Sequence, residues 1–284
     1  MKASDLPVAA LVREEKSNLE FYVAAQNHPG YGGTTLITRY VIGVRAFDAA
    51  EPDSPKTGNF NNERAYGNNC YAASNIHQWL NSDAKKGWYH PRHRYDAPPT
   101  KENVWYRENP YEEKPGFLYR FSDAFKRALL EVDIPYVIRT GAGEGRIEYV
   151  KGKAFLPSRT EINYDHELNT PEGTAFRLFV EDPYYTYAVA SPDQSNFHGR
   201  GWNPPSEYAT WDDPGIFDPA DGWKYWLRSC GSRYSFLART FNPTFRLSYD
   251  KVCCDVTGVR PVVNVDADLR LREAEEDGKI IYLV

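Results

Sequence analysis

Short runs rich in β-branched and aromatic residues lie at both ends of the 284-residue chain. Residues 18–27 and 34–47 flank the turn-forming sequence HPGYGGT, and the C-terminal part holds the runs KYWLRS, GVRPVVNV and KIIYLV. Runs of this composition, bounded by Gly and Pro, predict strands. Pairing the N-terminal strands with KIIYLV would leave neither edge open. We therefore expect the two ends of the chain to pair with each other.

Two short helices are predicted between these ends. Ser74 and Ser122 are candidate N-caps, and Pro135 is expected just beyond the end of the second helix. The apolar residues at helical spacing are Ile76, Trp79 and Leu80 in the first helix and Phe125, Ala128 and Leu129 in the second. Ser158 and Glu161 have the spacing of a capping box, and RIEYV and KAFLPS read as further strands.

Two long segments lack any steady hydrophobic period. Residues 84–116 and 181–222 mix Pro, Gly, charged and aromatic residues. Loops of this length are usually functional or pack through their own aromatic side chains. With no repeat, low-complexity tract or clear linker, one α+β domain over residues 1–284 is the simplest interpretation.

The charge of the chain limits its partners. Its net charge is −5 and it holds no block of Lys or Arg, which argues against nucleic-acid binding. No run reaches the length of a membrane span, and the N-terminus has no signal-peptide core, so we expect synthesis in the cytoplasm without membrane insertion. Association with a virion after cell lysis stays open.

Four cysteines, at positions 70, 230, 253 and 254, do not suggest a disulfide framework. Cys253 and Cys254 are adjacent, and successive side chains of an extended strand point to opposite faces. Cys70 precedes His77 by seven residues, but nothing marks the two as a catalytic pair. We expect free thiols and no enzymatic activity.

Metal sites are not predicted either. His90 and His93 are the only close histidine pair, and no further ligand completes a set. Four carboxylates at Asp212, Asp213, Asp218 and Asp221 do not have EF-hand spacing, so turns and caps are the favoured interpretation. We expect no cofactor and no metal.

Residues 225–261 form a stretch of mixed chemistry with no steady period. Three of the four cysteines lie in it, and from Leu227 to Asp250 no Lys, Glu, Gln, Met or Trp occurs. Lys251 is the first exception.

Several motifs occur in a fixed order along the chain: NCYAASNIHQWLNS, GWYHPRHRYDAPP, PGFLYRFSDAFKRALLEVDIP, AFLPSRTEI, NTPEGTAF, YWLRS and GVRPVVNV. Together they resemble a family of phage and bacterial proteins of unknown function, which is similar to the C-type-lectin-like fold of the formylglycine-generating enzymes. The resemblance covers residues 15–284. It implies an α+β fold of twisted antiparallel sheets with two short helices and long loops.

Some members of this fold group are variable proteins of diversity-generating retroelements. There, a reverse transcriptase copies a template with errors at adenines, so Asn codons become codons for many residues but never for Lys, Glu, Gln, Met or Trp. The composition of residues 227–250 fits this rule, and Lys251 would then be a fixed position. The resemblance thus implies a phage or prophage gene with a candidate variable region at 227–261.

The resulting hypothesis is a non-enzymatic protein that binds a protein or cell-surface ligand through a diversified face. Trp226, Leu227, Val259 and Val262 should be buried flanks. The side chains expected on the exposed binding face are Ser232, Arg233, Tyr234, Phe236, Thr240, Phe241, Thr244, Phe245, Arg246, Ser248, Tyr249, Asp250, Cys253, Cys254 and Asp255.

Three alternatives stay open. The first is an undiversified structural virion protein of the same fold. The second is an oxidase like the formylglycine-generating enzymes, whose copper-holding cysteine pair the adjacent Cys253 and Cys254 do not match. The third is a calcium-dependent sugar binder of the animal-lectin kind. Trp211–Asp213 is only superficially similar to the loop motifs of such proteins, and the paired motifs are missing.

Overall fold

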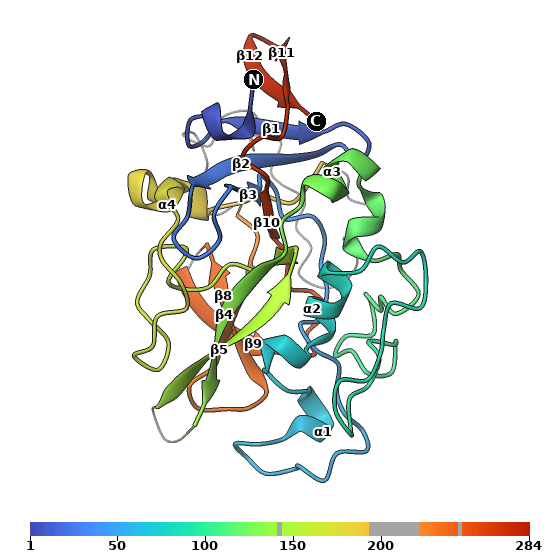
Figure 1. The fold of residues 1–284 in the computed structure, drawn as a ribbon. Helices are drawn as coiled ribbons and strands as arrows, with labels where there is room; N and C mark the ends of the chain where they lie inside the picture. Colours follow the sequence, from blue (N-terminus) through green and yellow to red (C-terminus); the bar gives the residue numbers. More distant parts are fainter. Residues whose placement is uncertain (141–143, 193–221, 244–245) are drawn as a thin grey trace.

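The chain folds into a mixed α+β structure made mostly of twisted sheet with short helices (Figure 1). The computed structural model describes residues 1–140, 144–192, 222–243 and 246–284. Its largest sheet has seven strands in the order β11-β12-β1-β2-β3-β10-β6. These strands are β1 (Leu11–Glu14), β2 (Leu19–Gln26), β3 (Thr34–Thr38), β6 (Ala154–Phe155), β10 (Val262–Val265), β11 (Arg272–Glu276) and β12 (Lys279–Leu283).

The two chain ends share this sheet as predicted, but the predicted strands do not pair directly with KIIYLV: β1, a strand that the sequence did not predict, lies between β2 and β12. β1 lies parallel to β12, with Val12 opposite Tyr282, and antiparallel to β2. Both termini therefore lie close together near one end of the molecule (Figure 1). Within this sheet, β3 and the C-terminal β10 are antiparallel neighbours, so the three N-terminal strands lie between C-terminal strands on both sides.

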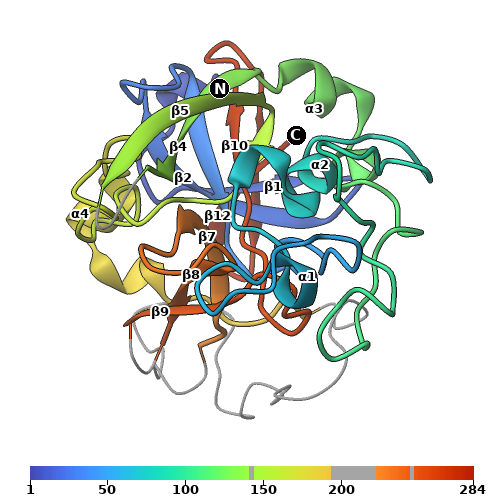
Figure 2. The ribbon, with the colours of Figure 1, turned by 90° about the horizontal axis from the view of Figure 1, so that it is seen from below.

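Two smaller sheets complete the strand content of the described residues. β4 (Val132–Arg139) and β5 (Gly145–Gly152) form an antiparallel hairpin. β7 (Tyr225–Cys230), β8 (Leu237–Asn242) and β9 (Arg246–Lys251) form a three-stranded antiparallel sheet, with β8 in the middle and β9 at the edge. The mixed stretch of the sequence is therefore ordered sheet over much of its length. In the view of Figure 1, β8 and β9 lie below β1 and β12, which are near the top of the molecule. Figure 2 shows β7, β8 and β9 side by side, seen from below.

The two predicted helices form with the predicted caps. Ser74 accepts a hydrogen bond from the His77 amide at the start of α2 (Asn75–Leu80), and Ser122 accepts one from the Phe125 amide at the start of α3 (Asp123–Ala128). The described residues also hold α1 (Glu63–Tyr66), α4 (Arg177–Glu181) and the 3₁₀ turns η1 (Ala3–Asp5), η2 (Tyr71–Ala73), η3 (Phe117–Arg120) and η4 (Pro183–Thr186).

The expected position of Pro135 beyond a longer helix is wrong. α3 ends at Ala128, and Pro135 lies inside β4, opposite Tyr149. A two-stranded sheet leaves one side of each strand without a partner, so a residue without an N–H is tolerated there. The carbonyl oxygen of Pro135 accepts a hydrogen bond from Arg228 Nε at 2.6 Å.

The Ser158–Glu161 pair makes both bonds of a capping box. The Ser158 amide donates to the Glu161 carboxylate at 3.0 Å, and the Glu161 amide donates to Ser158 Oγ at 3.1 Å. However, residues 159–163 form turns and no helix follows. The pair stabilises a bend instead. The Glu161 carboxylate also accepts hydrogen bonds from the buried Arg228 side chain.

The long loop at residues 84–116 holds no helix or strand, as predicted. Trp88 stacks on Tyr111 with ring centroids 5.4 Å apart, and both side chains are buried. The Tyr111 hydroxyl donates to the Ala46 carbonyl at 2.8 Å. The loop therefore packs through its own aromatic residues. The second predicted loop, 181–222, contains η4 and continues into residues outside the described part.

The predicted buried flanks of the mixed stretch are confirmed. Trp226, Leu227, Val259 and Val262 are all fully buried in the main hydrophobic core. Across the part of the chain that the structure describes, no helix has the length and apolar character needed to cross a membrane.

Candidate binding surface

The side chains predicted to form a binding face divide into two groups. Arg233, Arg246 and Tyr249 are exposed, and Tyr249 retains 56% of its accessible surface. The partly exposed members are Ser232, Tyr234, Ser248 and Asp250. Thr244 and Phe245 lie outside the described residues.

The other six side chains are buried, so their expected exposure is wrong. They are Phe236, Thr240, Phe241, Cys253, Cys254 and Asp255. Thr240 and Phe241 belong to β8, whose two edges are covered by neighbouring strands. Phe241 also packs against the rings of Tyr225 and Tyr187, at centroid distances of 5.4 and 5.3 Å. Thr240 and Phe241 are adjacent in the strand and point to opposite faces of the sheet, and both are buried, so both faces of β8 are packed here and its chemistry need not alternate.

Asp255 is buried because it holds the end of the long loop. Its carboxylate accepts backbone hydrogen bonds from Tyr106, Glu108 and Asn109 at 2.7–2.9 Å. The neighbouring Cys253 carbonyl accepts a bond from the Trp105 amide at 2.8 Å. Residues 253–255 therefore anchor a loop from the first half of the chain.

Asp250 is also engaged within the protein. Its carboxylate pairs with Lys224 Nζ at 2.5 Å and accepts a hydrogen bond from the Thr257 hydroxyl at 3.2 Å. The pair ties the edge strand β9 to the residue before β7. Asp250 therefore serves as a structural contact at the side of the sheet.

Five aromatic rings form a continuous row beside β8 and β9, which we call the aromatic strip. Successive ring centroids are 4.9–5.5 Å apart. In order, the strip contains Phe60, Tyr234, Phe236, Tyr66 and Trp105. Its two ends are exposed, with 49% of Phe60 and 44% of Trp105 accessible. The row therefore presents apolar surface to solvent at two points.

Cationic side chains lie over the rings at both ends of the strip. The Arg233 guanidinium is 5.1 Å from the Phe60 ring centre and 5.4 Å from that of Tyr234. Lys251 Nζ is 3.7 Å from the Trp105 ring centre and 4.3 Å from that of Tyr66. These are cation–π distances. Lys251 therefore contacts two rings of the strip at once.

Tyr249 lies on the same face of β9 as Lys251, because side chains two residues apart on a strand point the same way. It stands opposite Arg239 of β8, whose guanidinium is 5.7 Å from the Tyr249 ring centre. The exposed edge of the sheet thus extends the aromatic strip.

The loop that carries Arg233 and Tyr234 is held by the segment around Phe60. Asn69 Nδ2 donates to the carbonyls of Tyr234 and Leu237 at 2.9 and 2.7 Å. The Ser235 amide donates to the Phe60 carbonyl at 3.1 Å. These bonds fix the backbone of an exposed loop, which lowers the entropy lost when a ligand binds.

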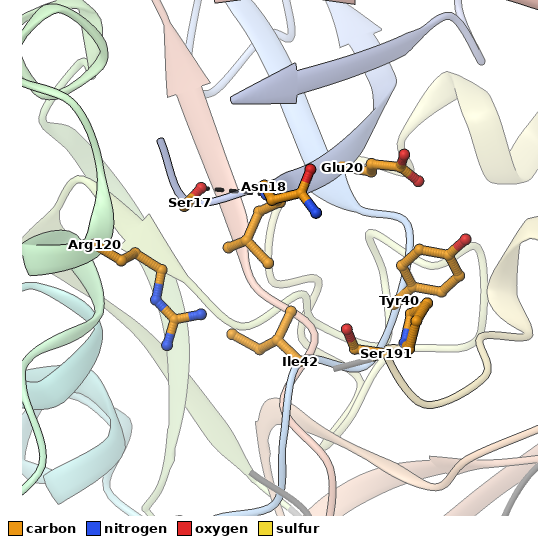
Figure 3. A pocket seen from close by; sticks show the side chains of 9 residues that line it. Ser17, Asn18, Glu20, Tyr40, Ile42, Arg120 and Ser191 are labelled. Carbon is orange, nitrogen blue, oxygen red and sulfur yellow. Dashed lines mark hydrogen bonds between the residues drawn. The ribbon is translucent and has the colours of Figure 1, made fainter. Parts of the chain in front are cut away.

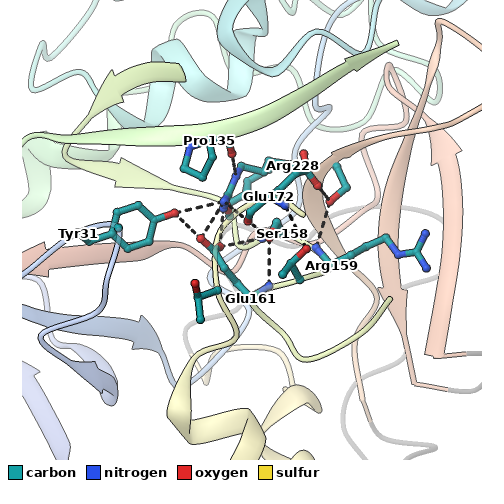
Figure 4. Close-up of polar contacts among 12 residues, drawn as sticks. Tyr31, Pro135, Ser158, Arg159, Glu161, Glu172 and Arg228 are labelled. Atoms are coloured by element: carbon teal, nitrogen blue, oxygen red, sulfur yellow. Dashed lines mark hydrogen bonds and ion pairs between the residues drawn. The ribbon is translucent and has the colours of Figure 1, made fainter. Parts of the chain in front are cut away.

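A buried polar cluster around Arg228 holds β7 in place (Figure 4). Arg228 forms a bidentate pair with Glu161 at 2.5 and 2.8 Å, and both side chains are fully inaccessible. The Tyr31 hydroxyl also donates to Glu161. Burial alone would lower the pKa of Arg228, but the Glu161 carboxylate raises it. The guanidinium is therefore permanently charged and fixed.

Glu172 is the second carboxyl group of this cluster. It accepts hydrogen bonds from the Ser229 hydroxyl and from the Val137 amide, the latter at 2.9 Å. Burial raises the pKa of Glu172 to about 7. Part of this buried cluster therefore titrates near neutral pH.

A family model described as a domain of unknown function, DUF6273, matches residues 32–267. The chain belongs to this family. No curated protein and no solved structure matches the chain. The matched residues run from just before β3 to just beyond β10, and they include the aromatic strip and all of the buried polar cluster except Tyr31. The strands contributed by the chain ends, β1, β2, β11 and β12, lie outside the match to DUF6273.

No metal centre is found among the described residues of this DUF6273 chain. His93 Nε2 lies 3.4 Å from a Glu51 oxygen, and no third ligand completes a site with His90. Asp212, Asp213, Asp218 and Asp221 lie outside the described residues, as does Trp211.

All four thiols are free, and three of them are buried. Burial raises the pKa of Cys254 to about 12 and also raises that of Cys253. Burial lowers the pKa of His77 to about 4 and raises that of Cys70. Each of these shifts favours the neutral form of the group, which works against a thiolate nucleophile or ligand.

Four residues of this surface were not predicted from the sequence, namely Phe60, Tyr66, Trp105 and Arg239. Trp105 lies in the loop that was predicted to be functional or self-packed, which is a partial signal. Phe60 and Tyr66 precede β7 by more than 150 residues. No local pattern predicts that they lie beside the mixed stretch.

Proposed function

We propose that this protein binds a protein ligand through the aromatic strip and the exposed edge of β9. The observation that carries the proposal is the continuous row of five rings, exposed at both ends and bordered by Arg233 and Lys251. Aromatic side chains and arginine dominate the energetics of protein interfaces. The fixed backbone beneath the strip supports the same role.

We also propose that the fold is C-type-lectin-like. The pairing of β1 with β12 and the long loop packed by Trp88 and Tyr111 support this assignment. The ordered motifs quoted above support it as well. In this fold, loops and a short sheet can present a surface whose side chains vary while the backbone does not.

We propose that diversification is confined to the accessible part of residues 227–261. The positions that can vary at little cost to folding are Arg233, Tyr234, Arg246, Ser248 and Tyr249. The buried residues of the same stretch have packing or anchoring roles. Random replacement there would remove folded variants from the population.

Two matched libraries test the proposal. One randomises Arg233, Tyr234, Arg246, Ser248 and Tyr249, and the other randomises Phe236, Thr240, Phe241, Cys253 and Asp255. Each is displayed on a cell surface, sorted for protease resistance and then selected on an immobilised protein. We expect the first library to stay folded and to yield binders, and the second to lose folded members. Equal loss of folding in both would refute the proposed surface.

A structural virion protein without diversification is the second candidate. A reverse-transcriptase gene beside an asparagine-rich near-copy of residues 230–257 would favour the diversified receptor binder. Its absence would favour the virion protein. For the oxidase alternative, the raised thiol pKa values count against a copper–thiolate centre.

A further inference from the structure

Two cavities lie side by side beneath the segment that links β1 and β2. The larger has a volume of about 330 Å³ and the smaller about 220 Å³, and Ser17 and Arg120 line both. The larger is bounded by side chains from distant parts of the sequence, namely Lys16, Arg45, Trp79, Lys114, Tyr119 and Arg120. In the smaller cavity, the Arg120 side chain extends toward Ile42, below Ser17 and Asn18 (Figure 3).

The larger cavity has a strongly positive lining. Lys16, Arg45, Lys114 and Arg120 contribute cationic side chains, and no Asp or Glu occurs among the described residues that line it. The chain as a whole carries a net charge of −5. The lining of this cavity is therefore positively charged, whereas the chain as a whole is negatively charged.

Arg45 gives this cavity a rigid floor. Only 5% of Arg45 is accessible, and its guanidinium lies over the rings of Trp79 and Tyr111 at 5.5 and 5.7 Å. One of its nitrogens donates to the Val44 carbonyl at 2.6 Å. A planar guanidinium held in this way keeps its donors in a fixed orientation.

The arrangement brings like charges together. Burial and, to a smaller extent, the nearby charge of Arg120 lower the pKa of Arg45 to about 10. Lys16 Nζ donates to the Phe121 carbonyl at 3.1 Å, which holds a third cation beside the same turn. An anion between these groups would relieve their repulsion.

We propose that this cavity binds a small oxyanion, either a phosphate group or the carboxylate of an acidic sugar. Both present paired oxygens that guanidinium groups bind through two parallel hydrogen bonds. The volume of about 330 Å³ accommodates a single ligand of this size. The site is distinct from the aromatic strip: Tyr66 of the strip belongs to α1, whereas Arg120 precedes α3 at another end of the molecule (Figure 1).

Isothermal titration of the full chain with inorganic phosphate, with glucuronate and with glucose, at fixed ionic strength, tests this proposal. We expect binding of at least one anion and none of glucose. Phosphate binding alone assigns a phosphate ligand, and glucuronate binding alone assigns a carboxylate ligand. Failure of both anions to bind at millimolar concentration would overturn the proposal.

Variants locate the site. Arg120→Gln and Lys114→Gln should each weaken binding by roughly tenfold, because each removes a charged donor. Lys101→Gln, which changes an exposed lysine that does not line either cavity, should leave binding unchanged. In ¹⁵N spectra, the Arg45 Nε signal should shift on addition of the bound anion. Binding that Arg120→Gln leaves intact, or an unmoved Arg45 signal, would also overturn the proposal.

Discussion

The buried cluster around Arg228 and the aromatic strip around Arg233 use arginine in opposite ways. Arg228 is inaccessible, and its charge is met by the Glu161 carboxylate and by three backbone carbonyls. Arg233 is exposed and lies over the faces of Phe60 and Tyr234. The first arrangement fixes one geometry, since any change leaves a buried charge unpaired. The second is open to solvent, so its side chains are free to change and to contact a ligand.

The largest effect should come from breaking the buried pair. Arg228→Met leaves the Glu161 carboxylate buried without its cation, and we expect a loss of about 3–5 kcal/mol in the free energy of unfolding. Arg233→Met is the matched control, with an expected change within about 0.5 kcal/mol. Urea denaturation monitored by circular dichroism measures both. Similar losses for the two variants would remove the contrast between the regions.

Two aromatic residues of the same sheet sharpen the comparison. Phe241→Ala should destabilise the fold by about 3–5 kcal/mol, because it opens a cavity beside Tyr225 and Tyr187. Tyr249→Ala removes an exposed ring from the edge strand, and we expect a change of about 0.5 kcal/mol or less. Melting temperatures and denaturant midpoints of the two variants test this ordering. A loss of stability for Tyr249→Ala as large as that for Phe241→Ala would mean that the Tyr249 ring is packed against the protein and that β9 is not an exposed edge strand.

The buried cluster should also make stability depend on pH. Since the pKa of Glu172 is raised to about 7 in the folded chain, folding favours its protonated form. Its contribution to the free energy of unfolding is complete below a pH of about 4.5 and is lost as the pH rises through about 7, with a total on the order of 3 kcal/mol.

Glu172→Gln is the variant that isolates this effect, because the amide stays neutral. The free energy of unfolding of the variant, relative to the unaltered protein, should rise between pH 5 and pH 8. Glu148→Gln changes a partly exposed carboxyl on β5, whose pKa is lowered by the Tyr136 hydroxyl and Arg146, and should show no such rise. A pH-independent difference for Glu172→Gln would show that this carboxyl does not titrate in that range.

The smallest expected effect lies at the strip. Lys251→Met removes the ammonium group over Trp105 and Tyr66, and we expect a loss of about 0.5–1 kcal/mol. Lys251→Arg should retain most of this energy. A double-mutant cycle with Trp105→Leu isolates the contact between the two side chains. A coupling energy of zero would show that Lys251 does not stabilise the strip.

The sequence by itself determined the local features of this protein. The caps at Ser74 and Ser122 and the strands at both chain ends follow from hydrogen bonding and hydrophobic patterns within a few residues. Even there, the capping box at Ser158 formed its bonds but no helix followed it. The Glu161 carboxylate instead pairs with Arg228 of β7, which is distant in the sequence.

Only the tertiary structure decided which residues of the mixed stretch face solvent. Phe241 and Tyr249 are both aromatic residues of the same sheet, and the difference between them is that the rings of Tyr187 and Tyr225 pack against Phe241, whereas 56% of Tyr249 stays accessible. Asp255 is buried because the amides of a loop some 150 residues earlier surround it. Phe60 and Trp105 join the surface for the same reason. Burial depends on which distant segments pack together, and side-chain chemistry along a short stretch does not contain that information.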